Sequence, residues 1–326
     1  MKKIITLLAL FVFASMGSQA QFYKYSNEFL AIGTGARGLS MSGAVIASVN
    51  DVTSSFWNPA GLAQEDKKFD LGLMHSEYFA GIAKYDYAGL ALPLANRTLH
   101  RTLAFSLIRF GVDDIPNTLF LFEPDGSINY NNITSFSVAD YAAMISYAQK
   151  IPVKGLSIGG TVKIIHRTAG SFANSWGLGL DAGIQYENNN WRLGAIGKDI
   201  TTTFNAWSFS FTDEEQQVFL ETNNVVPENS TELTAPRIIL GAAHVFEFGK
   251  KKNVSFLPEV DLDITTDGKR NVLISGKPIS IDPRIGVEAG YKKIIYLRGG
   301  IGNFQHITNI DSTRSLTVQP NVGVGL

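Results

Sequence analysis

Three glycines near the N-terminus have the spacing of a dinucleotide-binding motif. Gly33, Gly35 and Gly38 follow the pattern G-x-G-x-x-G, and Asp51 lies about where an acid would bind a ribose hydroxyl. In such a motif the glycines bring a pyrophosphate to the start of a helix, and the chemistry would be that of an oxidoreductase. The motif requires a buried strand before the glycines and alternating helices and strands after them.

The segment before the glycines has a different character. Lys2 and Lys3 precede an apolar stretch from Ile4 to Phe13, which ends in Ser18-Gln19-Ala20. This is the pattern of a secretory signal, and its apolar part is too short to span a bilayer. We therefore expect a signal peptide at residues 1–20. The few residues that remain before the glycines, "QFYKYSNEFLA", do not resemble a buried strand, so no nucleotide cofactor is expected.

No other set of reactive residues predicts an enzyme. The five histidines have neither H-x-x-H nor H-E-x-x-H spacing, and no G-x-S-x-G places a nucleophile on a turn. We expect no catalytic residue, no metal and no cofactor. An outer-membrane hydrolase would require a Ser, a His and an acid to converge at one rim.

The composition narrows the class of protein. The 28 Lys and Arg residues against 29 Asp and Glu residues give a net charge of −1, which offers no electrostatic basis for nucleic-acid binding. Without cysteine the chain has no disulfides and no site for a bacterial lipid anchor. After the signal there is no apolar run of about 18 residues that would form a helical span. An exported, charge-poor and glycine-rich chain can still enter a membrane as a β-barrel.

Residues 175–198, "SWGLGLDAGIQYENNNWRLGAIGK", carry the strongest evidence for a barrel. One face of the first strand has Trp176, Leu180 and Tyr186 with apolar residues between them, and the other face has glycine and polar residues, including Asp181. The two aromatic residues are separated by about 33 Å along a strand, or roughly 25 Å once the strand is tilted. This is the height of a lipid-facing band between two aromatic girdles, so we expect Leu180 to face lipid and Asp181 to face the lumen.

The same period of two predicts about twelve antiparallel strands. They are expected near 68–78, 86–95, 101–112, 136–149, 155–168, 175–188, 190–199, 236–249, 253–265, 283–291, 294–303 and 315–326. If the N-terminus is periplasmic, the periplasmic turns are all short, and the long connections 113–135, 200–235, 266–282 and 304–314 lie outside, as in outer-membrane barrels. The lumen-facing charges are expected to pair across strands; they are Lys163, Arg167, Asp181, Glu187, Arg192, Glu259, Asp261, Asp263, Arg284, Glu288 and Arg298.

The N-terminal part of the mature chain resembles a known family. "NEFL", "GARGLSMSGA", "ND" and "WNPAGLA", within residues 24–63, are similar to the start of the PorV/PorQ outer-membrane barrels, relatives of the FadL fatty-acid transporters. The resemblance implies a transmembrane antiparallel β-barrel of about 14 strands that ends in a further hairpin beyond "NVGVGL". Either that hairpin was lost from this chain or this member closes with fewer strands, and we favour the first.

The resemblance also implies that the segment before the barrel is a plug, or hatch, inside the lumen. We assign residues 21–66 to this hatch and residues 67–326 to the barrel. The hatch turn is expected at Trp57, Asn58, Pro59, Ala60 and Gly61, where the proline restricts the preceding residue to extended geometry. A hatch that only fills space and a hatch that gates the lumen are both consistent with the sequence.

Two outer loops contain more apolar residues than solvated loops usually do. The first loop has Leu119, Phe120, Leu121 and Phe122, and the second has Phe204, Trp207, Phe209 and Phe211 beside an acidic run. Either these residues fold over the barrel mouth or extend strands above the membrane, or they form a contact surface for another protein.

Two functions remain. The resemblance implies a non-enzymatic, integral outer-membrane component of the type IX secretion system, which binds the translocon or the C-terminal domain of secreted cargo. The kinship with FadL implies instead a transporter of hydrophobic small molecules, which an apolar lumen pocket with a side exit would favour. In both cases the surroundings are the lipid bilayer and lipopolysaccharide of the bacterial outer membrane.

Overall fold

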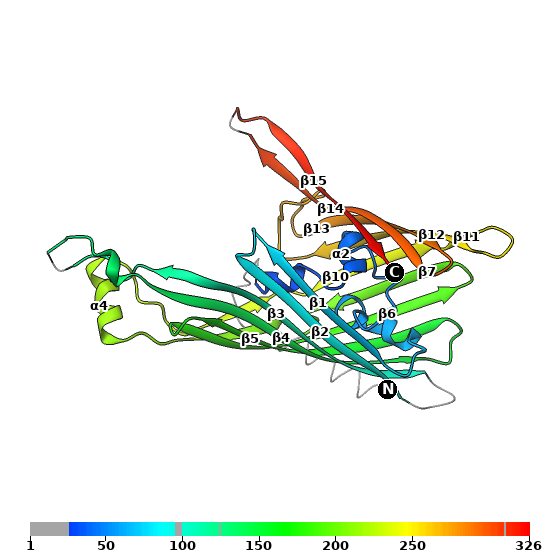
Figure 1. The fold of residues 1–326 in the computed structure, drawn as a ribbon, viewed down its shortest axis with the longest axis horizontal. Coiled ribbons are helices and arrows are strands. Elements are labelled where there is room, and N and C mark those ends of the chain that lie inside the picture. Colours follow the sequence, from blue (N-terminus) through cyan, green and yellow to red (C-terminus); the bar gives the residue numbers. More distant parts are fainter. Residues whose placement is uncertain (1–25, 95–99, 124, 310) are drawn as a thin grey trace.

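A computed structural model describes residues 26–94, 100–123, 125–309 and 311–326, so the expected signal peptide lies outside the described residues. One antiparallel sheet contains all fifteen strands of the described residues and curves around the N-terminal segment (Figure 1). Its main path follows the chain order through twelve strands. They are β1 (Asp70–Tyr78), β2 (Ala83–Leu94), β3 (Arg101–Asn117), β4 (Thr134–Lys150), β5 (Leu156–Ala169), β6 (Ala173–Asn188), β7 (Trp191–Lys198), β10 (Arg237–His244), β12 (Val254–Thr265), β13 (Ser280–Tyr291), β14 (Ile295–Thr308) and β15 (Arg314–Gly325).

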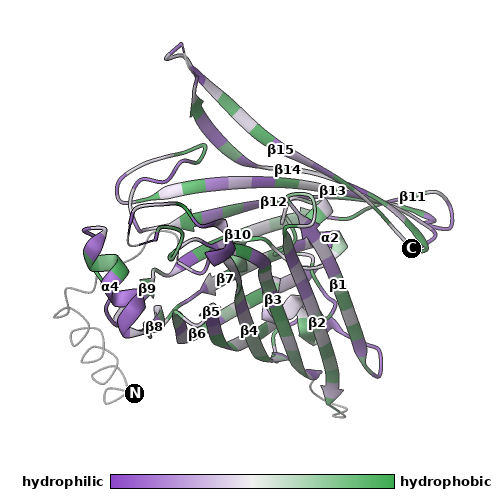
Figure 2. Ribbon diagram, turned by 60° about the vertical axis from the view of Figure 1, so that its left-hand side comes forward, coloured by the Kyte–Doolittle hydropathy of each residue, from purple (hydrophilic) through white to green (hydrophobic). Residues whose placement is uncertain are grey.

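These strands confirm the period-two prediction. Hydrophobic and hydrophilic residues alternate along them (Figure 2), because one face meets lipid and the other meets the lumen. In β6 the Trp176 side chain is 56% exposed and Asp181 is 5% exposed, so the predicted register is correct. None of the helices among the described residues is long and apolar enough to cross a membrane.

The outward faces form an apolar belt with a sharp outer border. One row of paired residues across six strands is entirely apolar: Leu71, Leu90, Phe105, Ile145, Val162 and Leu180. Four residues further along the strands, the corresponding row is polar and aromatic: His75, Asp86, Arg109, Tyr141, His166 and Trp176. Within that row the rings of His166 and Trp176 stack at 4.1 Å. Such a change from aliphatic to aromatic and polar side chains is typical of a membrane–water interface.

The long connections lie at one end of the sheet, here called the outer end. Three of them are shorter than predicted, because β3 extends to Asn117, β4 begins at Thr134, β13 begins at Ser280 and β14 extends to Thr308. The predicted loop 200–235 also contains regular structure: β8 (Thr203–Phe209), α4 (Asp213–Glu221) and β9 (Ser230–Thr234). β8 pairs with the outer half of β6, beyond the point where β7 ends. A further short strand, β11 (Phe246–Phe248), pairs with β12, and η4 (Tyr130–Asn132) lies in the β3–β4 connection.

The two ends of the sheet do not pair with each other. Within the part of the chain that the structure describes, no ladder joins β1 to β15. The β14–β15 hairpin projects away from the rest of the sheet at its outer end (Figure 1). The sheet therefore encloses the lumen on most sides and is open between its first and last strands.

Residues 26–66 lie against the inner face of the curved sheet (Figure 1). Their regular elements are short: η2 (Glu28–Ala31), α2 (Ala36–Ser40), α3 (Ser54–Trp57) and η3 (Pro59–Gln64). Met41, Ile46 and Leu62 from this segment are each 0% exposed. The apolar core of the protein is therefore the interface between this hatch and the inner face of the sheet.

Candidate functional site: the hatch and the outer vestibule

Two of the three motif glycines, Gly33 and Gly38, pack against an aromatic ring of the hatch, and Gly35 packs against Thr53. A Cβ added to Gly33 would lie 2.9 Å from the Trp57 ring, and one added to Gly38 would lie 2.6 Å from it. Gly33 and Gly35 also have positive φ angles of 100° and 76°, a conformation that favours glycine. The Trp57 indole Nε1 donates a hydrogen bond of 2.8 Å to the carbonyl oxygen of Thr34. Gly33 and Gly38 thus let the chain wrap closely around Trp57, and the helix that follows Gly35 and contains Gly38 has only five residues.

The predicted hatch turn is buried throughout, and Asn58 is its centre. The Asn58 Nδ2 donates to the carbonyl oxygens of Ile46 at 3.0 Å and of Ile184 in β6 at 3.1 Å. Its Oδ1 accepts from the backbone N–H of Ala60 at 3.2 Å, which caps η3 immediately before Pro59. Asn58 therefore joins two parts of the hatch to the barrel wall.

Side chains of the barrel wall also form hydrogen bonds with the backbone N–H and carbonyl groups of hatch residues 45–49. Asp261 Oδ2 accepts from the N–H groups of Val45 and Ile46 at 2.9 and 3.0 Å. Glu259 accepts from Ala47 at 2.7 Å, and Gln185 donates to the carbonyl oxygens of Ile46 and Val49 at 3.1 and 2.9 Å. A buried backbone needs such partners, and here the wall supplies them through side chains. The expectation that Glu259 and Asp261 pair across strands is wrong, because their carboxylates serve the hatch instead.

Other inward charges pair as expected, and one pair joins the hatch to the wall. Lys163 Nζ lies 2.8 Å from Asp181 and 2.5 Å from Asp199, and all three residues are buried. Arg37 of the hatch donates from Nε to Glu288 of β13 at 2.9 Å. Burial lowers the pKa of Arg37, but the carboxylates of Glu288 and Glu259 outweigh this and hold that pKa above its ordinary value. Arg37 therefore stays charged and holds α2 against the wall.

Glycines on the inner face of the wall let the hatch backbone approach closely. A Cβ on Gly159 of β5 would lie 2.5 Å from the carbonyl carbon of Pro59, and one on Gly300 of β14 would collide with the backbone of Met41. A Cβ on Gly194 of β7 would likewise lie 2.4 Å from the backbone oxygen of Ile46. The neighbouring Gly299 has no atom closer than 3.8 Å to such a Cβ. The inner-face glycines therefore shape the wall to the hatch.

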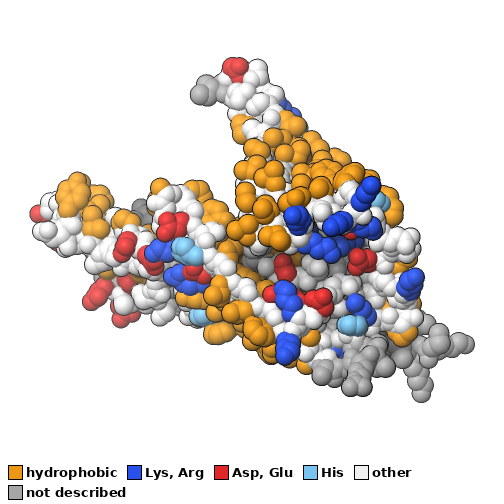
Figure 3. All heavy atoms as spheres, turned by 45° about the vertical axis from the view of Figure 1, so that its right-hand side comes forward, with side chains coloured by type: hydrophobic (Ala, Val, Ile, Leu, Met, Phe, Trp, Pro, Cys, Tyr) orange, Lys and Arg blue, Asp and Glu red, His pale blue; other side chains and the backbone are white. Residues whose placement is uncertain are grey.

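A vestibule of about 880 Å³ opens above the hatch toward the outer end. Leu39, Ser42 and Trp57 of the hatch form its floor, and residues of β12 to β15 form most of its wall, with Tyr78 of β1 on the opposite side. Figure 3 shows a hollow surrounded by charged side chains on this side of the molecule. Because β1 and β15 both line it, the vestibule also meets the opening between the first and last strands.

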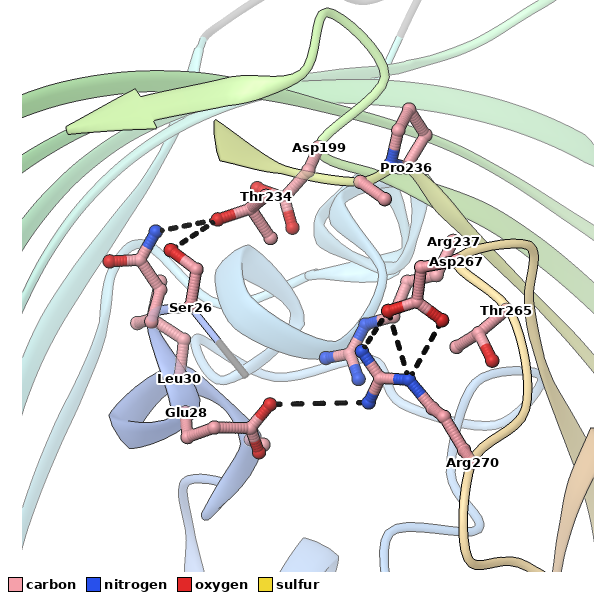
Figure 4. Close-up of a pocket in the computed structure, with 13 residues that line it drawn as sticks. Ser26, Glu28, Leu30, Asp199, Thr234, Pro236, Arg237, Thr265, Asp267 and Arg270 are labelled. Atoms are coloured by element: carbon pink, nitrogen blue, oxygen red, sulfur yellow. Dashed lines mark hydrogen bonds and ion pairs between the residues drawn. The ribbon is translucent and has the colours of Figure 1, made fainter. Parts of the chain in front are cut away.

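A smaller pocket of about 40 Å³ adjoins the vestibule (Figure 4). In it Arg270 lies between Asp267, with a closest contact of 2.6 Å, and Glu28 of the hatch at 4.0 Å. Burial lowers the pKa of Arg270, but the hydrogen bond and charge of Asp267 outweigh this and raise that pKa above its ordinary value. The lining of both cavities combines polar and apolar side chains, and its charged residues are held in place by ion pairs.

The fold is similar to that of a known channel. The CymD monoaromatic hydrocarbon channel superposes with a TM-score of 0.52 at 13% sequence identity, over 89% of this chain and 88% of that chain. The chain has the FadL-like barrel fold expected from its sequence. With its apolar outward belt, this FadL-like barrel is an integral outer-membrane protein.

Two toluene transporters are also similar to this FadL-like barrel. TbuX of Ralstonia pickettii gives a TM-score of 0.48 at 13% identity over 88% of each chain. TodX of Pseudomonas putida gives 0.49 at 14% identity over 87% of this chain and 85% of that chain. No family model matches the sequence, and no curated protein matches it.

The loop aromatics of this FadL-like barrel fall into two groups. Trp207, Phe209 and Phe211 stack on one another at 6.2 and 6.3 Å, and Phe211 continues the stack to Phe172 at 6.1 Å. The Trp207 Nε1 donates to Glu232 of β9 at 2.9 Å. These side chains are half-buried in an extension of the sheet beyond the membrane. Of the four aromatic residues predicted in this second loop, Phe204 is the exposed one, at 42%.

The β3–β4 loop is more open. Leu119 and Leu121 are half-buried, whereas Phe120 and Phe122 are 39% and 66% exposed. Ile128 and Tyr130, which the sequence analysis did not single out, add exposed apolar surface at the same tip. Their signal in the sequence was weak because single apolar residues among asparagines are common in loops.

Proposed function

We propose that this protein is a FadL-like transporter that carries small molecules across the outer membrane and whose hatch controls passage. The observation that supports this most is the vestibule, which opens at the outer end and stops at Leu39, Ser42 and Trp57 of the hatch. A ligand that enters the vestibule meets the hatch before it can go further. Its passage therefore requires the hatch to shift relative to β14 and β15.

The fold of the CymD monoaromatic hydrocarbon channel supports the same class of function. Fold similarity alone does not specify a ligand, and the substrate has to be inferred from the lining. The hydrophobic solutes named for that channel are therefore one class to test, beside polar solutes.

A reversible cross-link tests whether the hatch must move. A Cβ on Gly302 would lie 3.4 Å from the Cβ of Ser42, close to the spacing of about 3.5 to 4.5 Å found in disulfides. The chain has no cysteine of its own, so the Ser42→Cys/Gly302→Cys variant can form a single disulfide from hatch to β14. We expect oxidation to slow uptake of radiolabelled toluene or raffinose several-fold in porin-deficient cells, and reduction to restore it.

The single variants Ser42→Cys and Gly302→Cys are the controls, and their uptake should not respond to oxidation. If the locked and unlocked double variant took up both solutes at the same rate, the hatch would have no part in transport. The proposed function would then be wrong.

A second proposal is that the protein serves type IX secretion by docking the translocon or the C-terminal domain of exported cargo. It is supported by the exposed apolar tip of the β3–β4 loop, formed by Phe122, Ile128 and Tyr130. We expect Phe122→Ser/Tyr130→Ser to abolish co-purification of such a partner while the barrel stays folded, since central aromatic anchors contribute about 2 kcal/mol or more each. Leu220→Ser, at an exposed site on α4, is the control. Unchanged recovery of the partner from the double variant would contradict this second proposal.

A further inference from the structure

The wall of the vestibule contains a buried carboxylate, Asp263, of which one oxygen forms ion pairs and the other has no hydrogen-bond partner among the described residues. Asp263 Oδ2 contacts Arg237 at 3.3 Å and Arg284 at 2.8 Å, and its side chain is 4% exposed. A buried oxygen without a partner, here Oδ1, is costly unless a donor reaches it. Because this oxygen is itself buried, it is not open to the cavity, and Asp263 serves to hold Arg237 and Arg284 in the vestibule wall.

A row of amides on β14 and β15 faces the same space. Gln305 Nε2 donates to Asn303 Oδ1 at 2.9 Å, and Asn303 Nδ2 donates to Gln319 Oε1 at 3.2 Å. Nearer the floor, Asn321 Nδ2 donates to Ser42 Oγ at 2.7 Å. Each amide has two N–H donors and a carbonyl acceptor, so these contacts use only part of its capacity. The row offers both donors and acceptors to a ligand.

The charges of the lining are balanced within the protein. Arg237 and Arg284 share Asp263, Arg284 also lies 3.9 Å from Asp282, and Arg270 pairs with Asp267. An anionic ligand would have to displace a carboxylate that the chain already supplies. A hydrocarbon would remove water from the amides of β14 and β15 and give no hydrogen bond in return. A neutral ligand that carries many hydroxyl groups meets neither difficulty.

We propose that the vestibule binds a neutral, polyhydroxylated ligand, that is, a saccharide of two or three rings. A cavity of about 880 Å³ is within the range of small-molecule sites. Tyr78, which lines the cavity at its side, supplies aromatic surface for the apolar face of a sugar ring. The inference deepens the proposed function, because it names the class of solute for the same vestibule.

Calorimetric titration of the purified full chain with raffinose, maltotriose and chitotriose tests this proposal, with toluene as the apolar probe. We expect at least one trisaccharide to bind, and Asn303→Leu/Gln319→Leu to weaken it about tenfold or more, because hydrogen bonds to two amides are lost. Both side chains are exposed, so the variant should fold. Ser315→Leu, on the same face of β15 but outside the cavity lining, should bind as the unmodified protein does.

The proposal is overturned if no trisaccharide binds, if toluene binds and the trisaccharides do not, or if the control loses as much affinity as the double variant. Gln319→Leu alone provides a second measurement should the double variant misfold. Saccharide binding without any effect of the hatch cross-link on uptake would leave this inference standing and overturn the proposed function. Cross-link-dependent uptake of toluene without saccharide binding would support the proposed function and overturn the saccharide inference.

Discussion

Replacing Lys163 by methionine is expected to lower the free energy of unfolding by about 3 to 5 kcal/mol. The change leaves Asp181 and Asp199 buried beside each other without the ammonium group that lies 2.8 and 2.5 Å from them. Removing one partner of a buried ion pair costs more than the pair itself contributes, because the remaining charge cannot return to water. Urea unfolding in lipid vesicles, followed by tryptophan fluorescence, measures the effect.

Lys84→Met is the matched control for this prediction. Lys84 forms an ion pair with Asp113 at 3.1 Å, but its side chain is 41% exposed. Exposed pairs contribute about 0 to 1 kcal/mol, so this variant should be nearly as stable as the unmodified protein. Adding Asp181→Asn and Asp199→Asn to Lys163→Met should recover part of the loss. Equal effects of the two lysine replacements would show that the Lys163 cluster is hydrated.

The second large effect is expected for Leu180→Arg. Leu180 belongs to the apolar row in the middle of the outward belt, between Trp176 and Tyr186 on the same face of β6. An arginine at the bilayer midplane of such a barrel costs about 2 to 4 kcal/mol, because the guanidinium group must be taken into hydrocarbon. Equilibrium unfolding in phospholipid vesicles measures this cost.

Asn174→Arg places the same side chain on the same face of the same strand, two residues beyond Trp176. It lies past the aromatic border, where the cost falls to about 0 to 1 kcal/mol. If Leu180→Arg were no more destabilising than Asn174→Arg, the middle of β6 would not face lipid, and the membrane belt would have to be placed elsewhere.

The sequence was sufficient to predict the main strands because lipid on one side and a small-residue lumen on the other impose a period of two. The prediction was weakest beyond the membrane, where both faces of a strand meet water or other loops. There β3 continues to Asn117 and β4 already begins at Thr134, and the prediction missed β8 and β9. Helix α4 was detectable, since Thr212 and Glu215 form a capping box that is visible in "TDEE".

The site was harder to predict than the strands. A turn at Asn58 and Pro59 follows from local chemistry, but its contacts with β6 and with Ile46 depend on how distant segments pack. The role of Asp261 shows the same limit, because its partners lie more than 200 residues away in the chain. The period-two pattern predicts that Asp261 lies on the inner face, but it does not predict which residues Asp261 contacts there. The aromatic content of the loops predicted apolar contacts but did not distinguish the packed Trp207 from the exposed Phe122.

The inner-face glycines have a consequence for how the protein is assembled. Gly159, Gly194 and Gly300 leave hollows on three separate strands, and the hatch backbone fills each of them. Strands so poor in side-chain contacts on their inner side have little to hold their curvature until the hatch is in place. The hatch precedes every strand in the chain, and it is therefore available during export before the first hairpin forms. The hatch can therefore serve as a template on which the strands assemble in the order of the chain.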